Sequence, residues 1–233
     1  MSKQTAVSGS SRRKVGAPLT RGVIVEAALA EIDAKGLERL SMRVLGAALG
    51  VEAMALYHHF PSKGELLDAV VERLLDEVNL PPAGAMPPVD RLRRCLESYR
   101  QVAVRHPQAF SLLAVRRFNT ERTFAFYERI LEVLAEAGFD AAQSARLFRL
   151  VGYYATGAGL AEIASRAQEP DATPVKLEQV ADLERFPHVA AVAPHLRVGN
   201  LDAVFDFGLD VIFDAIRRSA VGAKRRRRGA QSA

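Results

Sequence analysis

Five side chains that can bind anions lie within one short stretch of this chain, between Leu40 and Lys63. They are a guanidinium, a phenol, two imidazoles and an ammonium: Arg43, Tyr57, His58, His59 and Lys63. Side chains of these types bind phosphate oxygens, and a planar guanidinium also matches the edge of a guanine. The chemistry they indicate is binding to nucleic acid, provided that the chain holds them on one exposed face.

The same stretch predicts two short helices joined by a tight turn. Ser41 is a good N-cap, and apolar residues follow it at helical spacing up to Leu49. Gly50 stops this helix, because glycine adopts the left-handed conformation without a steric penalty. A second helix is expected from Glu52 to His59, ended by Pro61. It would bury Val51, Leu56 and Phe60 and expose Ala53, Met54, Tyr57 and His58.

Such a pair is a helix-turn-helix, whose second helix has the dimensions to enter the DNA major groove. An ordinary helical hairpin is the alternative. The sequence LSMRVLGAALGVEAMALYHHFPSKGELLDAV resembles the DNA-binding domain of the TetR family of transcriptional regulators. Within it, LYHHFPSKGELLDAV is similar to that family's signature from the recognition helix to the linker helix. The resemblance is specific over roughly Leu19 to Glu77.

The resemblance and the side-chain chemistry together predict a DNA-binding set. Arg43 would reach a guanine edge or a phosphate, and Ala53, Met54 and Ala55 would make apolar contacts with thymine methyl groups. The resemblance implies phosphate contacts for Thr20, Arg21, Tyr57 and His59. Plain surface exposure is the alternative for the two histidines, and partial core packing is a further alternative for His59. The complete predicted set is Thr20, Arg21, Ser41, Arg43, Ala53, Met54, Ala55, Tyr57, His58, His59 and Lys63.

Composition and breaks in the pattern predict an all-α fold with two domains. The chain has 233 residues, no Trp, and abundant Ala, Leu, Glu and Arg. We expect a disordered basic arm over 1–18, a helix-turn-helix DNA-binding domain over 19–79, an effector-binding and dimerisation domain over 80–220, and a disordered basic tail over 221–233. The arm would follow DNA phosphates or merely solubilise the chain.

Two helices near the end of the second expected domain have patterns typical of an interface. Glycines and alanines recur in GYYATGAGLAEIA, and the last helix has too broad an apolar face for one neighbour. A phosphate-binding loop is excluded, because no Gly-Lys-Ser/Thr and no preceding strand is present. A four-helix homodimer interface is expected, formed by Gly152, Ala155, Gly157, Gly159, Val204, Gly208, Ile212 and Phe213.

Aromatic and polar residues earlier in this expected domain could line an effector pocket. Ordinary core packing is the alternative for each of them. The candidates are Tyr99, His106, Phe110, Phe118, Asn119, Phe124 and Tyr127.

Other classes of function lack support in the sequence. There is no HExxH, no dinucleotide-binding fingerprint and no paired-cysteine metal site, so we expect neither an enzyme nor a cofactor. The single cysteine, Cys95, excludes an internal disulfide and fits a reducing cytoplasm, and no apolar run is long enough to span a membrane. The resemblance implies a homodimeric repressor of a palindromic DNA operator, released by a small-molecule effector. A constitutive DNA-binding protein without a ligand, or an activator, is the alternative.

Overall fold

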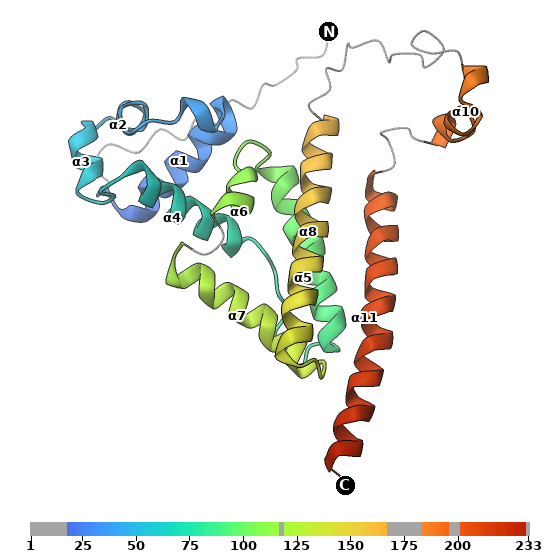
Figure 1. Ribbon diagram of the computed structural model, residues 1–233. Helices are drawn as coiled ribbons and strands as arrows, with labels where there is room; N and C mark the ends of the chain where they lie inside the picture. The colour runs from blue at the N-terminus through green and yellow to red at the C-terminus, as the bar shows by residue number, and fades with distance from the viewer. Residues whose placement is uncertain (1–17, 117–118, 167–182, 196–200, 232–233) are drawn as a thin grey trace, which may run out of the picture. The chain divides into compact units, whose positions relative to one another are not determined.

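The computed structural model describes residues 18–116, 119–166, 183–195 and 201–231, and within these ranges the regular elements are helices only. This confirms the all-α fold. The chain divides into two compact units (Figure 1). The first combines Met1–Val78 with His106–Phe126, and the second combines Asn79–Arg105 with Tyr127–Ala233. The expected basic arm and Phe118 fall outside the described residues.

The first unit contains α1 (Arg21–Lys35), α2 (Met42–Leu49), α3 (Ala53–Tyr57), α4 (Lys63–Asp76) and α6 (Ser111–Val115). Three of these helices begin directly after a residue whose hydroxyl caps the helix. The side-chain oxygens of Thr20, Ser41 and Ser62 accept hydrogen bonds from backbone N–H groups three residues later, at 3.3, 3.2 and 3.1 Å. The core between the helices is apolar and includes Ile24, Ile32, Leu45, Leu56, Phe60, Leu66 and Leu74.

The segment around α6 belongs to the first unit, although it lies within residues 80–220, where the sequence suggested an effector-binding and dimerisation domain. Two buried side chains of this segment, Phe110 and Leu113, supply apolar surface. Arg116 adds polar contacts with α4, since its Nε donates to Asp68 at 2.7 Å and its Nη2 to the Gly64 carbonyl at 2.9 Å. These contacts are remote in sequence, so helical periodicity does not reveal them.

The second unit contains α5 (Pro88–Arg105), most of α7 (Glu121–Glu136), α8 (Ala141–Arg166), the short α10 (Pro187–Val192) and α11 (Leu201–Gln231). α8 packs along α5, and α11 contacts both (Figure 1). Cys95 lies buried on α5, and burial raises the pKa of its thiol to about 12. Cys95 is therefore a buried structural side chain.

The last helix is longer than the sequence suggested. We expected it to end near Ser219 and a disordered tail to follow from 221, whereas α11 continues as helix to Gln231. Alanine, lysine and arginine are strong helix formers, so the tail composition permits this extension. Most of a short helix expected over 175–185 falls outside the described residues. No helix in the described part of the chain is long and apolar enough to cross a membrane.

Candidate nucleic-acid interface

The turn between α2 and α3 depends on two glycines. Gly50 has φ 67° and ψ 33°, the left-handed conformation that the sequence predicted. The Val51 N–H donates to the Gly46 carbonyl at 2.9 Å, which closes the turn against α2. A Cβ at Gly46 would lie 2.8 Å from the Val51 carbonyl oxygen, too close for any side chain. This second requirement arises from a close backbone approach, so no local sequence pattern reveals it.

Helix α3 is anchored by two side chains with no exposed surface, Leu56 and Phe60. Its opposite face carries Met54, which is 65% exposed, together with the exposed Tyr57 and His58. The helix therefore presents the face that the sequence predicted, with a thioether, a phenol and an imidazole available to a ligand.

Arg21 holds the end of α3 in place. Its guanidinium lies 4.0 Å from the centroid of the Phe60 ring and donates a hydrogen bond to the His59 carbonyl. The first residue of α1 thus fixes the end of the helix that carries Tyr57 and His58. The sequence predicted Arg21 only as a phosphate ligand, and its contact with Phe60 and His59 came from the structure.

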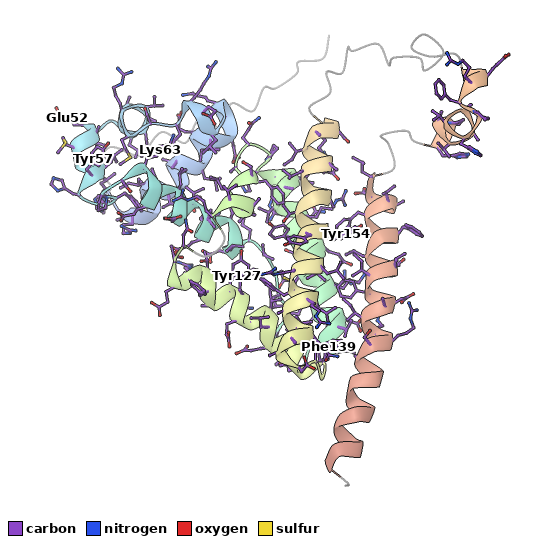
Figure 2. The ribbon with its side chains drawn as sticks, in the orientation of Figure 1. Glu52, Tyr57, Lys63, Tyr127, Phe139 and Tyr154 are labelled. Carbon is purple, nitrogen blue, oxygen red and sulfur yellow. The ribbon has the colours of Figure 1, made fainter. Side chains whose placement is uncertain are left out.

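Four cations of the first unit have no ion pair among the described residues: Arg21, Arg39, Arg43 and Lys63. Arg39 and Arg43 are exposed, and Lys63 is the first residue of α4 (Figure 2). The free N–H groups at the start of α4 add partial positive charge beside Lys63. This arrangement suits phosphate binding. Arg39 was not among the predicted residues, because nothing in its local pattern distinguished it.

The remaining members of the predicted DNA-binding set are less exposed or have structural contacts. Thr20 and Ser41 cap helices, so their hydroxyls already accept hydrogen bonds. Ala53, Ala55 and His59 are half-buried. The predicted set therefore contains exposed side chains, half-buried residues and helix caps.

His106, in the turn after α5, joins two helices of the first unit. Its Nδ1 lies 2.7 Å from Asp33 on α1, and its Nε2 lies 3.2 Å from Glu77 at the end of α4. Burial raises the pKa of Asp33, although the hydrogen bond from His106 opposes that shift. The imidazole is thus a bridge between α1 and α4 rather than an isolated pocket group.

The six predicted pocket residues that the structure describes are divided between the units. His106, Phe110, Asn119 and Phe124 belong to the first unit, where Asn119 donates to Asp68 at 2.9 Å and Phe110 is buried. Tyr99 and Tyr127 belong to the second unit. Tyr99 lies 3.5 Å from the Thr156 hydroxyl, and Tyr127 packs edge-on against Phe148 with ring centroids 5.4 Å apart.

The predicted interface residues also fall into two groups. Ala155, Gly159 and Phe213 are buried within the chain itself. Gly152, Gly208 and Ile212 are half-buried, and Gly157 and Val204 are exposed.

Gly208 serves the packing of α8 on α11. The Tyr154 hydroxyl donates to the Phe205 carbonyl at 2.7 Å, and a Cβ at 208 would meet that hydroxyl at 2.0 Å. Tyr154 lies on α8 facing α11 in Figure 2. The absence of a side chain at Gly208 therefore leaves room for Tyr154 of the same chain.

Exposed apolar side chains recur at helical spacing on both α8 and α11. We call them the apolar stripes, and their members are Leu150, Tyr153 and Leu160 on α8 and Val204, Phe207 and Val211 on α11. Their spacing of three, four or seven residues places each set on one face of its helix. Large exposed apolar patches are typical of interaction sites in general.

Two family models match the chain. "Bacterial regulatory proteins, tetR family" matches residues 24–70, and "Tetracyclin repressor-like, C-terminal domain" matches residues 84–219. The first match covers the helix-turn-helix, and the second covers more than half of the chain.

Individual proteins agree with the family models. An HTH-type transcriptional regulator of Saccharopolyspora erythraea is 30% identical over 184 residues, 79% of this chain and 72% of that protein. The class G tetracycline repressor of Vibrio anguillarum is 29% identical, over 86% and 94%. The structure of Streptomyces coelicolor ActR with actinorhodin superposes with TM-score 0.73 at 27% identity, over 88% and 99%. The chain therefore belongs to the TetR family of DNA-binding transcriptional regulators.

Proposed function

We propose that this regulator is a homodimeric repressor that binds a palindromic DNA operator and releases it when a small molecule binds. The observation that carries the proposal is the combination of one outward-facing helix-turn-helix with the unpaired apolar stripes on α8 and α11. One such module reads one half-site, and a symmetric pair reads two. Repressors are among the relatives, which favours repression over activation.

Recognition of DNA is assigned to α3. Met54 and the half-buried Ala53 and Ala55 offer apolar contact to thymine methyl groups, while Tyr57 and His58 offer hydrogen bonds. Few side chains of α3 can read base edges by hydrogen bonding. Much of the operator affinity should then come from phosphate contacts made by Arg43, Lys63 and Tyr57.

Lys63→Ala should weaken binding to every duplex by a similar factor. Loss of one phosphate contact should reduce the slope of log affinity against log salt by about one unit. Titrations of operator and random DNA across a salt series measure this slope. Lys35→Ala is the matched control, because Lys35 is paired with Glu31 at 2.8 Å and should leave the slope unchanged. An unchanged slope for Lys63→Ala would remove this residue from the phosphate contacts.

Dimerisation would use the apolar stripes. Pairing α8 and α11 with their copies across a two-fold axis makes a four-helix interface, the arrangement that closes a symmetric dimer. The two recognition helices would then meet successive major grooves, about 34 Å apart. The expected operator is a near-palindrome with half-sites separated by one helical turn.

Release by a small molecule is supported by the relatives. ActR has been crystallised with actinorhodin, and another relative is named as a tetracycline repressor. In this chain the turn after α5 carries His106, which contacts α1 and α4 through Asp33 and Glu77. A ligand that displaces this turn would alter the bracing of the helices around the recognition helix. The ligand can weaken DNA binding only by as much as its affinities for the two conformers differ. Such coupling free energies are about 1–3 kcal/mol.

Selection of bound duplexes from genomic fragments, followed by footprinting, tests the proposal. The expected result is a near-palindromic site protected by a dimer. Candidate effectors can then be screened by thermal protection and by release of the selected duplex. Bound sites without two-fold symmetry would contradict the dimeric mode. Thermal protection by a molecule that leaves DNA binding unchanged would contradict effector release.

A further inference from the structure

The part of this DNA-binding protein between its two basic ends, residues 21–223, which we call the body, carries a net negative charge. The whole chain is formally +5, but its first 20 residues contain four Lys or Arg and no acid, and residues 224–228 contain five Lys or Arg. Residues 21–223 therefore hold 23 basic and 27 acidic side chains, a charge of −4. Residues 21–78, which include the helix-turn-helix, hold six basic and ten acidic side chains, again −4.

Ion pairing reduces the cations available to DNA further. In the first unit Lys35 pairs with Glu31, Arg73 with Glu26 and Glu77, and Arg116 with Asp68. Several of the acidic side chains remain well exposed, among them Glu26 at 57%. A body of this charge repels the phosphate backbone at long range, so general attraction to DNA must come from outside it.

The longest basic run of the chain ends α11. Lys224 and the four arginines that follow it lie beyond Ala220, the last buried residue described on this helix. α11 continues through this run to Gln231 and extends past the ends of α5 and α8 (Figure 1). Neighbouring positions of an α-helix are about 100° apart around its axis, so five successive positions cover more than one full turn. The run therefore includes positions on every side of the helix. Such a segment has no apolar face to pack on a protein.

We propose that Lys224–Arg228 forms a second, sequence-independent binding site for duplex DNA. The major groove is about 12 Å wide and admits one α-helix between two rows of phosphates. A helix with cations at all positions around its axis matches that environment. The site keeps the dimer close to DNA while the helix-turn-helix searches for its operator, and it offsets the negative charge of the body.

Other polyanionic partners fit this run less well. A helix that lies on a membrane surface needs an apolar face beside its cations, and residues 224–228 contain no apolar residue. The major groove of double-stranded RNA is deep and narrow, so side chains cannot enter it readily. DNA remains the partner that the charge pattern favours, and anionic vesicles and duplex RNA serve as comparison probes in the test.

Truncation after Ala223 tests the site, with truncation after Arg228 as the matched control. The control loses only the uncharged segment GAQSA. Binding of a random-sequence DNA duplex is measured across a salt series for both proteins. Removing five cations should lower the salt slope by up to about four units and weaken random-DNA binding at low salt by more than tenfold. Equal slopes for the two truncations would overturn the proposal.

A full-length variant separates charge from chain length and folding. Replacing Arg225, Arg226, Arg227 and Arg228 with glutamine should reproduce the loss of random-DNA binding with an unchanged melting temperature. Operator sequence preference, measured as the ratio of operator to random affinity, should be kept or rise. The random duplex contains no operator, so this result is independent of the proposed repressor function. A variant that loses binding to phosphatidylserine vesicles or duplex RNA but not to DNA would also overturn the proposal.

Discussion

Val211→Asp should leave the protein folded but monomeric, with operator affinity reduced by about 100-fold or more. Val211 is 54% exposed on α11 and belongs to the apolar stripe with Phe207 and Val204. A dimer would bury this side chain near its symmetry mate, and two aspartates brought together there lose hydration and repel each other. Loss of the dimer removes the linkage between two half-sites, which is worth about 10²–10⁴ in affinity. Sedimentation velocity and operator titration measure the two effects.

Val115→Asp is the control for this experiment. Val115 is 76% exposed at the end of α6 and does not belong to the stripes, so the same substitution there should leave the dimer intact. Both variants should stay folded, because neither side chain is part of a core. A Val211→Asp protein that sediments as a dimer would rule out this interface.

The interface can be tested only at a residue that is exposed within its own chain. The sequence predicted Phe213 as an interface residue, but this side chain has no exposed surface within its own chain. A charge at that position should unfold the second unit, and monomers obtained in this way would say nothing about the interface. Val211 is a better site than Phe213, because its exposure separates association from folding.

Glu162→Leu should destabilise the second unit by about 3 kcal/mol, since breaking a buried ion pair costs about 3–5 kcal/mol. The side chains of Glu162 on α8 and Arg100 on α5 are 3% and 6% exposed. Arg100 also reaches the exposed Asp202 at 2.7 Å and lies 4.8 Å from the centroid of the Phe205 ring. Without Glu162 the buried guanidinium would keep only these weaker partners. Chemical denaturation measures the change in free energy of unfolding.

Two comparisons separate the cost of an unpaired buried charge from the value of the pair. Arg100→Met combined with Glu162→Leu should recover most of the lost stability, because no uncompensated charge remains. Asp76→Ala breaks the exposed pair with Arg122 and should cost less than about 1 kcal/mol. If Glu162→Leu were no more harmful than Asp76→Ala, the buried pair would not stabilise the association of α5 with α8.

The same pair predicts a dependence of stability on pH. Burial opposes ionisation of Glu162, but hydrogen bonds from Arg100 and Arg166 outweigh it, so the pKa of Glu162 lies below its ordinary value of 4.5. The unfolded chain then binds more protons than the folded chain as the pH falls below 4.5. This part of the stability is complete above that pH and is lost as the pH falls through the lowered pKa. The Glu162→Leu variant should lack this part of the acid sensitivity.

Most helices of this chain could be predicted from the sequence, because the signals that define them are local. Thr20, Ser41 and Ser62 start helices and Gly50 ends one, each through bonds or backbone angles within four residues. The outward face of α3 followed from the spacing of Leu56 and Phe60. The extent of α11 could not be predicted in this way, since lysines and arginines suit a helix and a solvated tail equally well.

By itself, the sequence determined the all-α class, the positions of the helix-turn-helix elements and the family, because cap residues, periodicity and a family signature are all encoded over short distances. Only the tertiary structure decided which side chains remain available. It placed Arg21 on Phe60, His106 between Asp33 and Glu77, and Phe213 inside the chain, while leaving Phe207 and Val211 exposed. These outcomes depend on contacts between residues far apart in sequence, which helical periodicity alone does not specify.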